Sequence, residues 1–254
     1  MLEVRSLTKT YSTIPALENV SFAIAPGQVL GYLGPNGSGK STTVKIITGL
    51  LEPTAGSVFF NGANIQNDLA AYKRLVGYVP EEANLYPFLT GLEYLELIGR
   101  LRGMKGGTIR RRTEEMLEIF SLTLHRHSTI GTYSKGMRQR ILLIAALMHN
   151  PDLIIFDEPL SGLDVTSALI FRELVKALSR AGKIIFYCSH VLEVVERVCS
   201  HIIILQNGKQ LAYGTVEDLK TFQQMPSLEA AFAHLVHERD ASASAAALME
   251  AVSH

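Results

Sequence analysis

A short glycine-rich loop has the most specific chemical pattern in the sequence. Two glycines, a lysine and a serine follow the spacing G-x-x-x-x-G-K-S, in a segment that consists of Gly34, Pro35, Asn36, Gly37, Ser38, Gly39, Lys40 and Ser41. Glycines let several backbone N–H groups converge on one anion, and a following helix adds partial positive charge. In such loops the lysine reaches the β- and γ-phosphates of a nucleotide, and the serine hydroxyl binds Mg²⁺. A glycine-rich turn without a ligand is the alternative interpretation.

Two adjacent acids follow a continuously apolar run. Residues 153–156 read Leu-Ile-Ile-Phe, and Asp157 and Glu158 come directly after them. Buried carboxylates need a partner or a metal ion, so this pattern is unusual for a purely structural core. We assign Asp157 to Mg²⁺ and Glu158 to the attacking water, which it orients and deprotonates. General-base help of this kind contributes roughly 10²–10⁴ in rate.

A histidine stands at the end of another apolar run. His190 follows residues 183–189, and ligands of open α/β sheets bind at the carboxyl ends of the strands. A lone histidine is more often structural than catalytic. Because the loop at Gly34 and the acid at Asp157 also follow apolar runs, we expect His190 to contact the γ-phosphate and the attacking water. Lys40, Glu158 and His190 are therefore the predicted catalytic residues, and Thr42 extends the predicted nucleotide contacts.

Two kinds of strand pattern position these groups. Residues 2–8, 20–25 and 56–61 alternate apolar and polar side chains, which predicts a half-buried antiparallel sheet near the N-terminus. Residues 29–33, 153–156, 183–188 and 201–205 are compact apolar runs, typical of strands buried on both faces. A helix is expected over residues 41–48, where Gly49 ends it, and another over 191–199. The expected fold class is α/β, with a parallel sheet.

The strand pattern disappears between about residues 84 and 133. Residues 92–101 and 110–120 have helical spacing, so this part reads as a helical insertion. From about Ser227 the chain is rich in alanine and contains no chemical motif. We expect a C-terminal helix there with a frayed end.

Composition narrows the class of protein. Lysine plus arginine and aspartate plus glutamate both number 24, which argues against a nucleic-acid partner because such proteins usually have a basic excess. The two cysteines, Cys188 and Cys199, show neither metal-ligand spacing nor a disulfide framework. Apolar runs are too short to span a bilayer, and the N-terminus lacks a signal-peptide pattern. These features predict a cytosolic P-loop nucleoside triphosphatase.

A further segment identifies the kind of triphosphatase. Residues 133–140, YSKGMRQR, precede the Asp157 strand and resemble the signature motif of ATP-binding-cassette (ABC) ATPases. Residues 161–164, SGLD, resemble their D-loop, His190 their switch histidine, and Tyr11 the aromatic residue that stacks on adenine. The resemblance implies an ABC ATPase domain over residues 1–220, with the helical subdomain inserted at about 84–135. Residues 221–254 would form a C-terminal helical extension.

The resemblance also implies a site shared between two molecules. Ser134, Lys135 and Gly136 would form a second phosphate-binding helix start, which binds the ATP held by another cassette. The common signature of the family has glycine at Lys135 and glutamine at Met137, so this chain departs from it. It also has Glu81 where the family usually has glutamine. We expect Glu81 to be a Mg²⁺ ligand that couples the insertion to the site, and not the hydrolytic base.

The function that the resemblance implies is transport. With one cassette and no spanning segment, the chain would be the ATP-binding and ATP-hydrolysing subunit of an exporter, bound to a separate membrane permease at the cytoplasmic face of the membrane. Its cofactors would be ATP and Mg²⁺, and it would form a homodimer or a heterodimer of ATPase subunits. The alternative is a soluble ABC ATPase that acts on a cytosolic assembly, such as metal-cluster assembly or translation.

Overall fold

A six-stranded sheet forms the centre of the computed structural model, which describes residues 1–160, 165–223 and 227–236. The strand order is β10-β9-β3-β8-β7-β6, and all neighbours are parallel except the hairpin of β9 and β10. The strands are β3 (Val29–Leu33), β6 (Val76–Val79), β7 (Leu153–Asp157), β8 (Ile184–Cys188), β9 (His201–Gln206) and β10 (Lys209–Thr215). Every residue of β3, β7 and β8 is buried, as their continuous apolar sequences predict.

A second, antiparallel sheet is built from the N-terminal region. Its order is β2-β1-β4-β5, with strands β1 (Leu2–Tyr11), β2 (Ile14–Ile24), β4 (Ala55–Phe60) and β5 (Ala63–Asn64). A turn at Asn61 and Gly62 joins β4 to β5, and both residues have positive φ. The N-terminal antiparallel sheet predicted from the alternating pattern is therefore confirmed.

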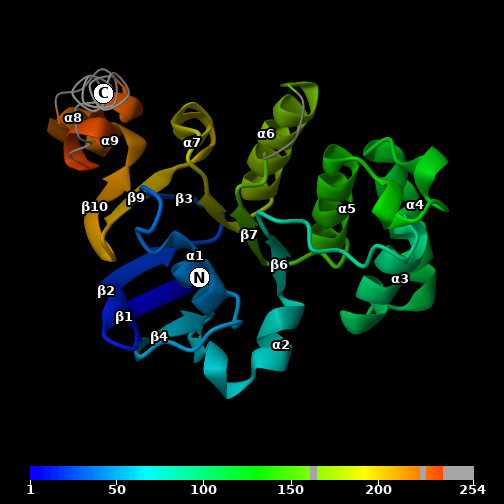
Figure 1. The fold of residues 1–254 in the computed structure, drawn as a ribbon, viewed down its shortest axis with the longest axis horizontal. Coiled ribbons are helices and arrows are strands. Elements are labelled where there is room, and N and C mark those ends of the chain that lie inside the picture. Colours follow the sequence, from blue (N-terminus) through cyan, green and yellow to red (C-terminus); the bar gives the residue numbers. More distant parts are fainter. Residues whose placement is uncertain (161–164, 224–226, 237–254) are drawn as a thin grey trace, which may run out of the picture.

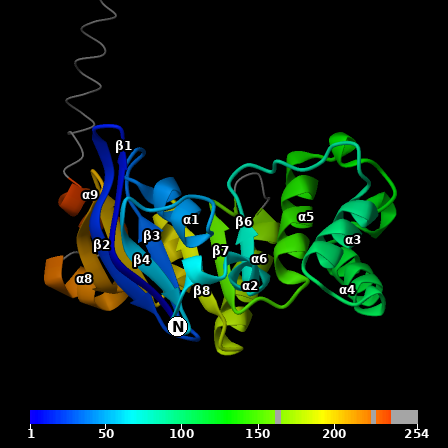
Figure 2. The ribbon, with the colours of Figure 1, turned by 90° about the horizontal axis from the view of Figure 1, so that it is seen from below.

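Helices cover the central sheet and form a separate layer at one end (Figure 1). They are α1 (Lys40–Ile47), α2 (Leu69–Arg74), α3 (Gly91–Leu101), α4 (Gly106–Ile119), α5 (Lys135–Leu147), α6 (Val165–Arg180), α7 (Leu192–Val198), α8 (Val216–Gln223) and α9 (Leu228–Val236). Short 3₁₀ turns occur at Ile65–Asn67, Thr123–His125 and Ile130–Thr132. Figures 1 and 2 both show α3, α4 and α5 at one end of the molecule and α8 and α9 at the other.

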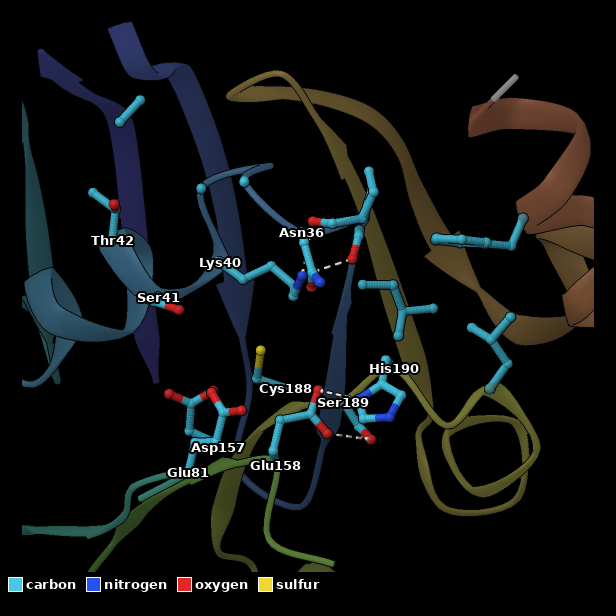
Figure 3. A pocket seen from close by; sticks show the side chains of 18 of the residues that line it. Asn36, Lys40, Ser41, Thr42, Glu81, Asp157, Glu158, Cys188, Ser189 and His190 are labelled. Atoms are coloured by element: carbon cyan, nitrogen blue, oxygen red, sulfur yellow. Dashed lines mark hydrogen bonds and ion pairs between the residues drawn. The ribbon is translucent and has the colours of Figure 1, made fainter. Parts of the chain in front are cut away.

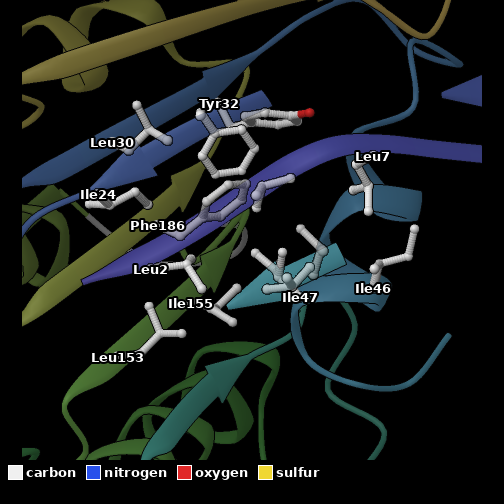
Figure 4. Close-up of a cluster of buried hydrophobic side chains, with 14 of the residues drawn as sticks. Leu2, Leu7, Ile24, Leu30, Tyr32, Ile46, Ile47, Leu153, Ile155 and Phe186 are labelled. Carbon is white, nitrogen blue, oxygen red and sulfur yellow. The ribbon is translucent and has the colours of Figure 1, made fainter. Parts of the chain in front are cut away.

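Alternating side chains of the central strands build two cores on opposite faces. On one face Leu30, Tyr32 and Phe186 pack with α1 and the antiparallel sheet, as Figure 4 shows. On the other face Phe156 and Tyr187 pack with α5, α6, α7 and Leu228 of α9. Burying one such side chain contributes about 1.5–3 kcal/mol, so the two cores fix the strands whose ends form the site.

The helical subdomain has a third core of its own. It includes Tyr94 of α3, Ile109 and Leu117 of α4, and Ile141 of α5. Thr90 and Glu93 form a capping box at the start of α3, in which each side chain accepts from the other residue's backbone N–H. The helical subdomain that the sequence predicts is confirmed. None of the helices in the described part of the chain is long and apolar enough to cross a membrane.

Candidate active site

The phosphate loop lies between β3 and α1, and its glycines are required by the backbone around it. Gly39 has φ +106°, a left-handed conformation, and a Cβ atom there would lie 2.5 Å from the carbonyl oxygen of Ala16. A Cβ atom on Gly34 would lie 2.4 Å from the carbonyl oxygen of Leu205 and from Ser38 Oγ. Side chains at these two positions would displace the neighbouring backbone, so the loop depends on glycine.

Lys40 begins helix α1 and folds over the loop. Its Nζ donates to the carbonyl oxygens of Gly34 and Pro35, at 2.6 and 2.9 Å. The first turn of α1 contains no acidic residue, which favours an anion at its N-terminus. These two hydrogen bonds hold the Lys40 ammonium against the loop, and its third N–H stays available for a further acceptor.

Asp157 ends β7 and faces a group of charged and polar neighbours. It is only 7% exposed and pairs in register with Cys188 on β8. Burial raises the pKa of Asp157 to about 6; a hydrogen bond with the Cys188 thiol opposes this rise, whereas the charge of Glu81 adds to it. Figure 3 shows the carboxylates of Asp157 and Glu81 side by side below Ser41. Such crowding of acids favours a cation between them.

Glu158 connects β7 to the end of β8. Its backbone has φ +47°, which is uncommon for a residue other than glycine, and its N–H donates to the carbonyl oxygen of Cys188 at 2.9 Å. Its carboxylate lies 2.8 Å from His190 Nδ1 and accepts a 3.2 Å hydrogen bond from Ser189 Oγ. The Glu158 side chain is 13% exposed and that of His190 is 76% exposed. The pair therefore presents one sheltered acid and one accessible imidazole.

These groups surround one cavity of about 760 Å³. The phosphate-loop part of its lining comprises Gly34, Pro35, Asn36, Gly37, Gly39, Lys40, Ser41 and Thr42. Across from it lie Glu81, Asp157, Glu158, Cys188, Ser189 and His190 (Figure 3). All three predicted catalytic residues and the three predicted metal ligands thus line the same space.

The cavity can hold a nucleotide, and its side-chain oxygens suit a Mg²⁺ ion that is also bound by phosphate and water. Among the described residues, no group of three or more histidine, cysteine, aspartate or glutamate side chains could bind a metal alone. Magnesium in nucleotide sites usually takes one or two protein ligands and completes its shell with phosphate and water oxygens. Ser41 and Asp157 both line the cavity and supply such oxygens.

Two residues that were predicted to contact the nucleotide of their own chain do not line the cavity. Ser38 is buried within the loop, and its Oγ has no hydrogen-bond partner among the described residues. Tyr11 lies 46% exposed on the β1–β2 hairpin, and Lys9 Nζ stands 5.5 Å from the centre of its ring. Ala16 of the same hairpin lines the cavity, but Tyr11 does not. Adenine stacking on Tyr11 therefore remains a prediction.

The signature segment starts a helix away from this cavity. Ser134 caps α5 by accepting a 3.2 Å hydrogen bond from the N–H of Met137. Ser134 and Lys135 are exposed, and neither these residues nor Gly136 line the cavity. Figures 1 and 2 both place α5 apart from α1, beyond β6 and β7. Gln139 of α5 donates to the carbonyl oxygen of Pro159, which links this helix to the loop after Glu158.

One predicted motif is not covered, and several lining residues were not predicted. The D-loop-like residues 161–164 lie outside the described part of the chain. Cys188 and Ser189 precede His190, and the strand-end argument could have identified both. Helix α9 adds Glu229, Phe232 and Ala233 to the lining, although its sequence contains no motif.

Comparison with known proteins places the chain in a family. A family model described as "ABC transporter" matches residues 17–161. The linearmycin resistance ATP-binding protein LnrL of Bacillus subtilis is 40% identical over 219 residues, which cover 86% of this chain and 70% of the relative.

Solved structures agree with this result. A structure described as an ATP-binding subunit of an ABC transporter has a TM-score of 0.88 at 34% identity and covers 92% of this chain and 99% of that one. A dimeric ATP-binding cassette in a post-hydrolysis state, bound to ADP and Pi, has a TM-score of 0.78 at 30% identity, with coverage of 85% and 98%. The chain therefore belongs to the ABC transporter family and is an ATP-binding subunit that hydrolyses ATP.

Proposed function

We propose that the chain powers export through a separate membrane permease, to which it binds at the cytoplasmic face of the membrane. Two cassettes close on ATP and reopen after hydrolysis. The observation that best supports the hydrolytic part is the position of Glu158, sheltered between Ser189 and His190 at the wall of the cavity that contains the phosphate loop.

In the proposed reaction, the residues of this chain act on a water molecule and on the terminal phosphate. Glu158 orients the water and accepts its proton as the water oxygen attacks the γ-phosphorus and the bond to ADP breaks. His190 donates a hydrogen bond to the γ-phosphate. Lys40 and the N–H groups of the loop stabilise the charge on the β- and γ-phosphates.

Magnesium, held by Ser41 and Asp157, would neutralise charge on the phosphates when bound. Glu81 lies beside Asp157 and is a further proposed ligand. The raised pKa of Asp157 supports this assignment, because a metal ion next to a buried acid restores its charged form.

A second cassette would complete the site. The exposed start of α5, with Ser134, Lys135 and Gly136, provides N–H groups that suit a phosphate, but it does not line the cavity of its own chain. The ADP- and Pi-bound relative is a dimer, which supports the pairing of two cassettes. Loss of the γ-phosphate would then remove contacts that hold the dimer closed.

The direction of transport is supported by relatives that are named for linearmycin resistance and for Nod factor export. A pull-down from a membrane fraction tests the partner. We expect a membrane protein with several spanning segments to co-purify. Partners found only in the cytosolic fraction would instead support the alternative of a cytosolic assembly ATPase.

Phosphate release tests the hydrolytic role. We expect Glu158→Gln to bind Mg-ATP but to hydrolyse it at least about a hundredfold more slowly than the wild type. Glu52→Gln, at an exposed position away from the cavity, is the control and should keep wild-type turnover. Wild-type rates in Glu158→Gln would contradict the proposed role of Glu158.

A further inference from the structure

Helix α9 belongs to the C-terminal extension, yet it forms part of the wall of the nucleotide cavity. Glu229, Phe232 and Ala233 are spaced three and four residues apart, so they lie on one face of the helix, and all three line the cavity. Figure 3 shows the ribbon of α9 on the side of His190, across from α1. The sequence motifs of the site lie within residues 1–220, so α9 contributes lining residues that belong to none of these motifs.

The helix is anchored at this position by packing. Leu228 is fully buried in the core that also contains Val195, Val198 and Cys199, and Phe232 is half-buried against the same core. Ser227 caps the helix, since its Oγ accepts a 3.2 Å hydrogen bond from the N–H of Ala230. A helix held at its start by a buried leucine presents its next turn to the cavity in a defined orientation.

The same packing connects α9 to the switch histidine. Helix α7 begins two residues after His190 and contacts α9, and Leu192 at its start lines the cavity. His190 itself is mostly exposed, and its imidazole contacts the Glu158 carboxylate. The position of its backbone therefore depends on how α7 is held.

The cavity face of α9 also adds a negative charge. Glu229 is exposed and lines the cavity that contains the phosphate loop. A carboxylate on this wall repels a nucleotide triphosphate, and the repulsion weakens as salt screens it.

We propose that α9 takes part in the function of the ATP site. Phe232 is a positioning residue that holds α7 and His190, and Glu229 weakens nucleotide binding. The inference rests on the proposed roles of the phosphate loop and His190. It assigns to the C-terminal extension an effect on the ATP site of the same chain.

The first test compares substitutions of Phe232 in the full-length chain. We expect Phe232→Ala to lower kcat about three- to thirtyfold and to weaken ATP binding more than ADP binding, because His190 contacts only the γ-phosphate. Phe232→Leu should restore most of the activity. Phe59→Ala is the matched control, since Phe59 is half-buried on β4 and does not line the cavity.

The second test changes the charge alone. We expect Glu229→Gln to tighten Mg-ATP binding about two- to threefold at low ionic strength, with no difference at about 1 M salt, where the Debye length is short. Glu217→Gln on α8, exposed and away from the cavity, should leave binding unchanged.

The outcomes separate this inference from the proposed function. If the wild type hydrolyses ATP but Phe232→Ala and Glu229→Gln match it in kcat, in the ATP-to-ADP affinity ratio and in salt dependence, the role of α9 is overturned. A fall in melting temperature alone would also overturn it, since that result indicates packing without positioning. If the wild type neither binds nor hydrolyses ATP, the proposed function fails instead.

Discussion

At the scale of single residues, the site depends on acids held in unfavourable surroundings. Asp157 is almost fully buried beside Glu81 and Glu158, and burial is the main reason that its pKa is raised to about 6. A strand that buries a carboxylate sacrifices stability unless a cation compensates for it. The raised pKa therefore has a measurable consequence for folding.

Replacing Asp157 by asparagine should stabilise the protein when neither metal nor nucleotide is present. The native pKa lies above the unfolded one, so the native state binds more protons between about pH 4 and pH 6, and stability falls as pH rises through that range. In EDTA we expect Asp157→Asn to gain about 1–3 kcal/mol at pH 7.5 and to lose this gain near pH 4, by urea denaturation. The control Asp152→Asn, at the exposed position just before the same strand, should show no such pH-dependent gain. A gain for Asp157→Asn that is independent of pH would contradict this account.

We propose that Glu81 has a role distinct from that of Glu158. Its charge helps to raise the pKa of Asp157, whereas Glu158 alone contacts His190. We expect Glu81→Gln to lower the pKa of Asp157 and to keep ATP hydrolysis within about tenfold of the wild type. Steady-state phosphate release, measured for Glu81→Gln and Glu158→Gln side by side, tests the expected rate of hydrolysis. Equal loss of hydrolysis in the two variants would mean that the roles are assigned wrongly.

At the scale of elements, the sequence predicted those strands that have a continuous apolar pattern. The runs at β3, β7 and β8 are apolar at almost every position, and the structure buries all of them. Strand β6 was not predicted, because Gly77 and Tyr78 interrupt its apolar pattern. In the fold, Gly77 is needed since a Cβ atom there would lie 2.3 Å from the carbonyl oxygen of Ala146. That packing requirement comes from α5, which is distant in the chain.

Two glycines of the phosphate loop differ in the space that surrounds them, and this difference can be tested. Both Gly37 and Gly39 have positive φ, but only a Cβ atom on Gly39 meets backbone, at Ala16. We expect Gly37→Ala to cost about 1–2 kcal/mol of stability and to keep ATP binding. Gly39→Ala should cost more and lose ATP binding, as measured by denaturation and by titration with a fluorescent ATP analogue. If both variants bind ATP equally well, close packing at Gly39 does not shape the loop.

At the scale of the whole molecule, the motifs predicted which residues meet but not everything that surrounds them. Lys40, Asp157, Glu158 and His190 stand at the carboxyl ends of parallel strands or just beyond them, so their meeting at one cavity follows from the topology. The approach of α9 could not be predicted, because Leu228 and Phe232 read as an ordinary apolar helix face. Only the assembled core shows which surface receives it.

The position of Ser134 raises the main question about the whole molecule. Its helix start is exposed and separated from the phosphate loop of the same chain, as Figures 1 and 2 show. A site that needs both groups must be shared by two molecules. We therefore predict that a variant with a damaged phosphate loop and a variant with a damaged α5 start restore each other's activity when they are mixed.

ATP hydrolysis by a mixture of two variants tests this claim most directly. Lys40→Ala removes the lysine of the phosphate loop, and Ser134→Glu places a negative charge at the start of α5; we expect each variant alone to be folded and inactive. Mixed together, they should form dimers with one undamaged composite site and recover part of the wild-type activity. Full activity of Ser134→Glu alone, or no recovery in the mixture of folded variants, would contradict the shared site.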